Sequence, residues 1–142
     1  MIVTPVFARI GETIEQLDKR YGKPVGNGRE IVETRRYLFK GFTIVVGLEN
    51  GISQCEVYRK DPDSRMSESE LYTLMVANAG KSPWVREPDE NLNQFTYWSV
   101  DKKTRVAIYA LKTHQLLITS KVSLPKFVHL LDASRQNQLD GF

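Results

Sequence analysis

The chain contains few of the residues from which catalytic and metal sites are usually built. Its 142 residues include one cysteine, Cys55, and two histidines, His114 and His129. A single cysteine excludes a disulfide framework within the chain, and these three residues show none of the spacings typical of a zinc site. The sequence has no glycine-rich phosphate-binding loop and no nucleophile elbow. It therefore predicts no bound metal, no cofactor and no enzymatic activity.

The cysteine and the histidines could form one catalytic combination, with the Cys55 thiol as the nucleophile and a histidine as its base. Cys55 falls in the middle of an expected strand, away from any helix N-terminus that could lower the pKa of a thiol. His114 falls in an expected turn and His129 in an expected terminal helix. A small, buried packing residue is the favoured interpretation of Cys55.

The chain also lacks a strong charge of one sign and a long hydrophobic run. Twenty basic and 17 acidic residues are mixed along it, giving a net charge of +3. This balance gives no strong nucleic-acid signal, although strand aromatics with nearby Arg and Lys residues could stack on bases. No apolar run approaches the roughly 20 residues of a membrane-spanning helix, so no transmembrane segment is predicted.

What the chain does contain is one pattern that occurs twice, over residues 10–60 and 66–121. Each copy begins with a capping box, Thr13 with Gln16 and Ser67 with Glu70, which predicts helices over 13–21 and 67–79. Gly and Pro follow each helix and stop it. A third helix is expected over 123–135, and all of residues 1–142 are expected to form a single domain.

Short runs of alternating apolar residues follow each of the first two helices and predict three strands in each copy. Asn50-Gly51 lies between two such runs and is a strong hairpin signal. Residues 26–28 and 86–90 are interpreted as loops because they are rich in Gly, Pro and charge. The predicted fold is α+β: two helix-plus-three-stranded-meander repeats joined into an antiparallel sheet of about six strands, with the helices on one face.

The first copy resembles the SmpA/OmlA (BamE-type) module of bacterial envelope lipoproteins. The resemblance rests on two stretches, the helix with its stop at Gly11, Thr13, Leu17, Gly22 and Pro24, and the return at 48–53, Leu-Glu-Asn-Gly-Ile-Ser. Two such modules in tandem are similar to the architecture of the β-lactamase-inhibitor protein. The resemblance implies an exported binding domain without catalytic activity.

The first eight residues are apolar and end in Val6-Phe7-Ala8, the small-x-small spacing of a signal-peptidase site. Two interpretations stay open. Residues 1–8 are the remainder of an export signal, which predicts an exported or periplasmic protein, or they are an ordinary first strand of a cytoplasmic one.

Taken together, these patterns predict a non-enzymatic binding module, exported to the cell envelope, whose partner is another protein. Aromatic side chains often anchor protein interfaces, so the expected interaction surface consists of Trp84, Tyr97, Trp98 and Tyr37. The alternative is a small-molecule-binding or small enzymatic domain that uses the open face of the sheet. Its pocket would contain Cys55, Tyr58 or Tyr97.

Overall fold

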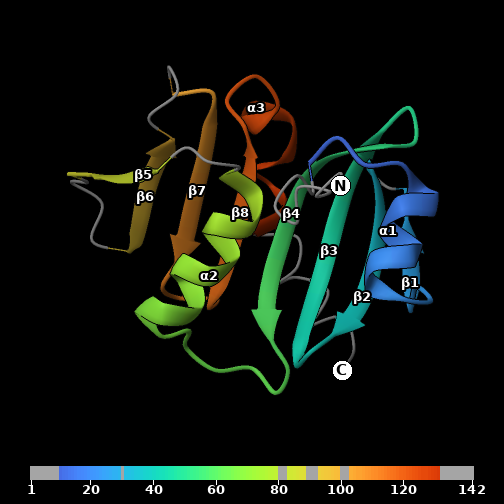
Figure 1. Cartoon of the computed structure of the whole chain (residues 1–142), viewed down its shortest axis with the longest axis horizontal. Coiled ribbons are helices and arrows are strands. Elements are labelled where there is room, and N and C mark those ends of the chain that lie inside the picture. The colour runs from blue at the N-terminus through green and yellow to red at the C-terminus, as the bar shows by residue number, and fades with distance from the viewer. Residues whose placement is uncertain (1–9, 30, 80–82, 89–92, 100–102, 132–142) are drawn as a thin grey trace, which may run out of the picture.

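The computed structural model describes residues 10–29, 31–79, 83–88, 93–99 and 103–131 of the chain. These residues form an eight-stranded antiparallel sheet with three helices, an α+β architecture (Figure 1). The helices are α1 (Ile14–Tyr21), α2 (Glu68–Ala79) and α3 (Leu124–Phe127). The strands are β1 (Gly26–Gly28), β2 (Glu33–Phe39), β3 (Phe42–Glu49), β4 (Ile52–Lys60), β5 (Trp84–Glu87), β6 (Gln94–Ser99), β7 (Arg105–Ala110) and β8 (Gln115–Ser120).

The strands lie in the order β1-β2-β3-β4-β8-β7-β6-β5. Each half of the chain forms a meander of four neighbouring strands, and the two meanders join where β4 pairs with β8. The expectation of about six strands was therefore wrong, because β1 and β5 lie in segments that were interpreted as a loop and as part of a loop. With three and four residues, these two outermost strands are too short to show an alternating pattern.

The predicted starts of α1 and α2 are confirmed by their hydrogen bonds. The Thr13 hydroxyl accepts from the backbone N–H of Gln16 at 3.2 Å, and the Gln16 side chain accepts from the N–H of Thr13 at 2.9 Å. Ser67 and Glu70 form the same reciprocal pair at 2.8 and 3.1 Å. Each capping box satisfies two N–H groups that would otherwise lack partners, and so fixes where the helix begins.

The hairpin signal is confirmed as well. Asn50 and Gly51 adopt positive φ angles of 54° and 74° between β3 and β4. Lys40 and Gly41 adopt the same conformation between β2 and β3, with φ angles of 50° and 80°. Turns of this kind match the twist of the strands and fix the register of the hairpins.

Helices cover both faces of the sheet, which corrects the expectation that they share one (Figure 1). On the first face, which we call the α1/α2 face, Leu17 and Tyr21 of α1 and Leu71 and Met75 of α2 belong to one core cluster. The strand residues of that cluster are Tyr37, Ile44, Val46, Leu48, Tyr58, Ala107, Tyr109, Leu116 and Ile118. Side chains alternate along a strand, so the intervening residues point to the second face.

On this second face, which we call the α3 face, Phe127, Leu130 and Leu131 belong to the other core cluster. The strand residues of that cluster are Cys55, Val57, Val106, Ile108 and Leu117. The expected helix over 123–135 begins close to α3, and residues 132–135 lie outside the described residues.

Gly47 of β3 is what allows Phe127 to lie directly against the sheet. A Cβ atom at Gly47 would lie 2.6 Å from the Cys55 Sγ atom and 2.6 Å from the Phe127 Cδ1 atom. Neither distance leaves room for a side chain, so the glycine forms a notch that the phenyl ring fills. Phe127 is consequently fully buried, although α3 is only four residues long.

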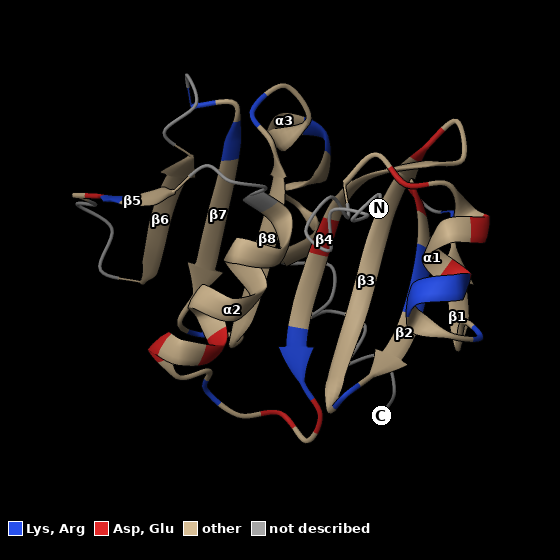
Figure 2. Cartoon of the chain, viewed as in Figure 1, with Lys and Arg blue, Asp and Glu red and all other residues tan. Residues whose placement is uncertain are grey.

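Basic and acidic residues alternate over the surface rather than gathering by sign. Figure 2 shows both signs side by side on α1. Among the described helices, none is both long and apolar enough to cross a membrane.

Candidate functional site

Three of the four predicted interaction residues lie at the β5–β6 end of the sheet, on opposite faces. Trp84 and Tyr97 point to the α1/α2 face, where both are partly buried against the core. The Trp84 indole N–H donates to the backbone oxygen of Met75 at 2.8 Å, which ties β5 to α2. Trp98 points to the α3 face and is partly buried there.

Tyr37 does not belong to a surface. It is fully buried between α1 and the sheet, with its ring 5.3 Å from the ring of Tyr21. Its hydroxyl donates to Asp18 at 2.6 Å, and the same carboxylate accepts two hydrogen bonds from Arg35 at 3.0 and 3.1 Å. Burial, and then the hydrogen bond to Asp18, raise the pKa of Tyr37 above its ordinary value. Tyr37 therefore holds α1 on the sheet, and its place in the expected surface is corrected.

The exposed side of the β5–β6 hairpin carries a small apolar area on the α3 face. Val85 pairs with Trp98 across the strands, and its side chain is 57% exposed. The Trp98 indole N–H donates to the carboxylate of Glu87, which shares that face. We call Val85, Glu87 and Trp98 the edge patch. On the reverse side of the hairpin, the Arg86 guanidinium lies 4.1 Å from the centre of the Phe95 ring.

The thiol of Cys55 is inaccessible. It is fully buried beneath Phe127, and burial raises its pKa well above the usual value. A thiol that stays protonated and buried is a poor nucleophile. His114 forms an exposed contact of 3.2 Å with Asp63 at the far end of β8. Tyr58, another candidate for a pocket on the sheet, is also fully buried.

A buried carboxylate at the middle of the sheet escaped sequence reasoning. Glu56 of β4 is fully buried and accepts hydrogen bonds from the hydroxyls of Tyr21 at 2.6 Å and Tyr58 at 2.5 Å. The Asn78 amide in turn donates to the Tyr58 hydroxyl at 3.0 Å. This network connects α1, β4 and α2 on one face. Its members are fully buried or nearly so, which is typical of a structural network.

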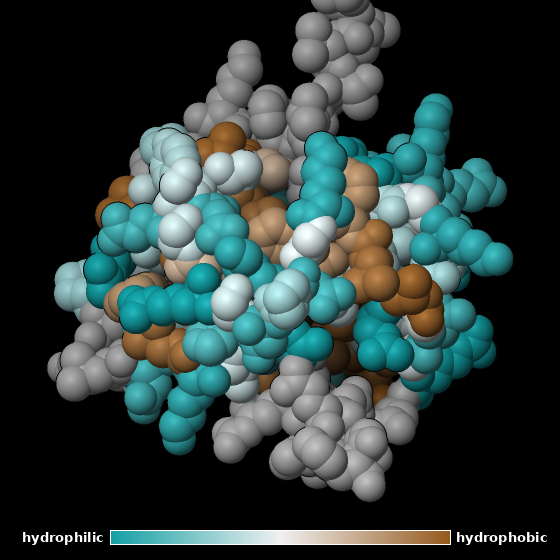
Figure 3. Space-filling view, turned by 90° about the horizontal axis from the view of Figure 1, so that it is seen from below, coloured by the Kyte–Doolittle hydropathy of each residue, from teal (hydrophilic) through white to brown (hydrophobic). Residues whose placement is uncertain are grey.

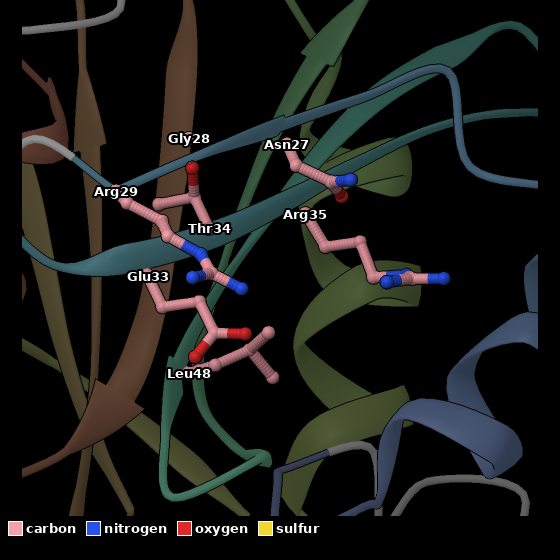
Figure 4. A pocket seen from close by; sticks show the side chains of 7 residues that line it. All are labelled: Asn27, Gly28, Arg29, Glu33, Thr34, Arg35 and Leu48. Atoms are coloured by element: carbon pink, nitrogen blue, oxygen red, sulfur yellow. The ribbon is translucent and has the colours of Figure 1, made fainter.

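A shallow pocket lies at the opposite end of the sheet, beside β1 (Figure 4). It measures about 80 Å³ and is lined by Asn27, Gly28, Arg29, Glu33, Thr34, Arg35 and Leu48. Sequence reasoning missed it because residues 26–28 were interpreted as a flexible loop. The polar residues that flank this short glycine-containing segment are the sequence feature that could have indicated a polar pocket here.

The described residues offer no cluster of three or more His, Cys, Asp or Glu side chains that could hold a metal ion. The surface seen from below the view of Figure 1 is mostly hydrophilic, with separate hydrophobic areas (Figure 3). The edge patch and the pocket beside β1 are two candidate sites among the described residues.

No protein-family model and no curated protein sequence matches the chain. Two solved structures are similar in backbone. One is a cysteine-rich secretory protein from Staphylococcus aureus subsp. aureus Mu50, with 9% identity, a TM-score of 0.46 and coverage of 82% of this chain and 46% of that one. The other is an extracellular protein containing an SCP domain from Bacillus anthracis str. Ames, with 11% identity, a TM-score of 0.48 and coverage of 87% and 48%.

The chain thus spans about half the length of either structure. Likeness at this level does not transfer a function. The expected resemblance to SmpA/OmlA modules and to the β-lactamase-inhibitor protein was wrong, because the structures found to be similar are SCP-type secretory proteins.

Proposed function

We propose that the chain is a non-enzymatic binding module and that a partner protein docks at the edge patch, adding a strand beside β5. The observation that supports this most directly is the exposure of Val85, at 57%, on an outermost strand next to a partly buried tryptophan. Tryptophan is enriched among the residues that anchor protein interfaces.

The position of β5 favours strand addition as the binding mode. Among the described strands, β5 is paired with β6 alone, so one side of its backbone is available to an incoming strand. In such complexes the backbone hydrogen bonds supply affinity, while side chains on alternate positions supply specificity. Here Val85 and Glu87 occupy the alternate positions on the α3 face. Arg86 and Glu87 also discourage indiscriminate pairing, since charges on an edge strand oppose aggregation.

Two further proposals accompany this one. We infer that the halves of the chain are repeats of one unit, since each consists of a helix followed by a four-stranded meander and they join through their last strands. We also infer that the protein is exported, on the basis of the Val6-Phe7-Ala8 spacing. Cell fractionation with mass spectrometry of the mature N-terminus tests the second of these.

The binding proposal is tested by affinity capture from the native cells after mild cross-linking, with Val85→Asp and Trp98→Ala compared with the wild type. Tyr72→Ala is the matched control, because Tyr72 is an exposed aromatic residue on α2, on the opposite face. The two edge-patch variants should lose one captured protein by about tenfold or more, as expected for an interface anchor. Equal capture by all three variants would contradict docking at this patch.

A further inference from the structure

The pocket beside β1 lies at the other end of the sheet from the edge patch, and the inference drawn from it goes beyond the proposed function. Its lining contains five polar side chains, those of Asn27, Arg29, Glu33, Thr34 and Arg35. Four of them, all but Arg35, have no side-chain hydrogen-bond or ion-pair partner among the described residues. A depression lined by several unengaged donors and acceptors is suited to a polar ligand.

The lining is bipolar rather than of one charge. Arg29 contributes a guanidinium, and Glu33 contributes a carboxylate. Figure 4 shows these two groups directed toward the same space, whereas Arg35 is directed away from them. Arg35 is already engaged, because it donates two hydrogen bonds to Asp18. The positive charge available to a ligand is therefore that of Arg29, and the negative charge beside it is that of Glu33.

The size of the pocket limits the ligand. A volume of about 80 Å³ has room for roughly three water-sized groups, at about 30 Å³ for each. Ligands of drug size occupy pockets of about 300–1,000 Å³ and do not fit. The ammonium, α-carbon and carboxylate of an amino acid are of the right size. Leu48 supplies an apolar wall for the α-carbon.

We propose that this pocket binds a small zwitterionic α-amino acid. The carboxylate of the ligand pairs with the Arg29 guanidinium, whose planar fork matches a carboxylate. The ammonium of the ligand pairs with the Glu33 carboxylate. A simple anion would be attracted by Arg29 and repelled by Glu33. A simple cation would be attracted by Glu33 and repelled by Arg29.

The test is a titration of the full-length, ¹⁵N-labelled chain with glycine, followed by the backbone amide resonances of Asn27, Gly28 and Thr34. Acetate and methylammonium, which carry the two charges separately, are titrated in parallel. Glycine should produce saturable shifts, with each single-charge compound at least about tenfold weaker. Arg29→Gln and Glu33→Gln should each weaken glycine binding by about tenfold or more.

Matched controls remove the same charges elsewhere on the surface. Lys112→Gln and Glu15→Gln alter exposed residues outside the pocket and should leave the binding of glycine unchanged. Acetate binding as tight as that of glycine, with tighter binding in Glu33→Gln, would overturn the proposal in favour of a simple anion site. The absence of a saturable glycine shift would overturn it as well. None of these results bears on the edge patch, whose test uses other residues.

Discussion

Replacing Gly47 with alanine should destabilise the protein, although alanine is ordinarily the better residue in a strand. The entropic cost of glycine in a strand interior is roughly 0.5–1 kcal/mol relative to alanine, so an unobstructed substitution would stabilise. At Gly47 the new Cβ atom would lie 2.6 Å from both the Cys55 Sγ atom and the Phe127 Cδ1 atom. Forcing a methyl group into a packed core costs about 1–3 kcal/mol. The difference between these two terms is a net loss of up to about 2.5 kcal/mol.

Labelling of Cys55 can also show which of the two contacting side chains moves in Gly47→Ala. Cys55 is held within the central strand β4, whereas Phe127 belongs to a four-residue helix on the surface. We therefore expect the phenyl ring to lift and the thiol beneath it to become accessible. In Gly47→Ala the unfolding midpoint should fall by up to about 10 °C, at about 2–4 °C for each kcal/mol. Iodoacetamide should also label Cys55 faster than in the wild type.

Gly26→Ala is the matched control for this substitution. A Cβ atom at Gly26 would meet only the end of the Arg36 side chain, at 2.9 Å, and that flexible, exposed side chain can move aside. Its stability should stay within about 0.5 kcal/mol of the wild type. If the Gly47→Ala protein is as stable as the wild type and its Cys55 is equally protected from labelling, then the space at Gly47 is not what allows Phe127 of α3 to pack against the sheet.

Two further predictions concern buried polar groups on the α1/α2 face. Glu56→Ala should lower the free energy of unfolding, measured by urea titration, by about 2–5 kcal/mol. The reason is that the hydroxyls of Tyr21 and Tyr58 lose their hydrogen-bond acceptor. A loss below about 1 kcal/mol would show that the network contributes little to stability. Burial raises the pKa values of Tyr37 and Tyr109 in the folded protein. As the pH rises above about 10, these tyrosines therefore ionise first in the unfolded chain, which favours unfolding. Their contribution to stability is present below a pH of about 10 and is lost above it. Urea midpoints measured at increasing alkaline pH should fall less steeply in Tyr37→Phe than in the wild type, and identical slopes would contradict this assignment.

Local sequence signals were sufficient for the parts of the fold that depend on local chemistry. The capping boxes at Thr13 and Ser67 predicted where α1 and α2 begin, since each cap is made within one helical turn. Asn50-Gly51 predicted its hairpin because few other residues adopt a positive φ angle without strain. The antiparallel α+β class followed from these elements.

Contacts between distant residues were not predictable in the same way. Phe127 is buried because Gly47, 80 positions earlier, leaves space for it, and no local pattern connects the two. This contact places α3 on the face that was expected to be open. Tyr37 was expected on a surface because it is aromatic and lies in a strand next to arginines. Its burial depends on Asp18 of α1, which accepts a hydrogen bond from the Tyr37 hydroxyl and pairs with Arg35.

On the α3 face, the described helix α3 packs against the middle of the sheet. One row of residues on the α3 face pairs across all eight strands, from Gly28 through Thr34, Gly47, Cys55, Thr119, Val106 and Trp98 to Val85. Phe127 covers the middle of this row, while Gly28 and Thr34 line the pocket and Trp98 and Val85 form part of the edge patch. At about 4.8 Å for each of the strand spacings, the two ends lie about 34 Å apart along the sheet. The pocket and the edge patch therefore share no side chain, so each can be altered without changing the other.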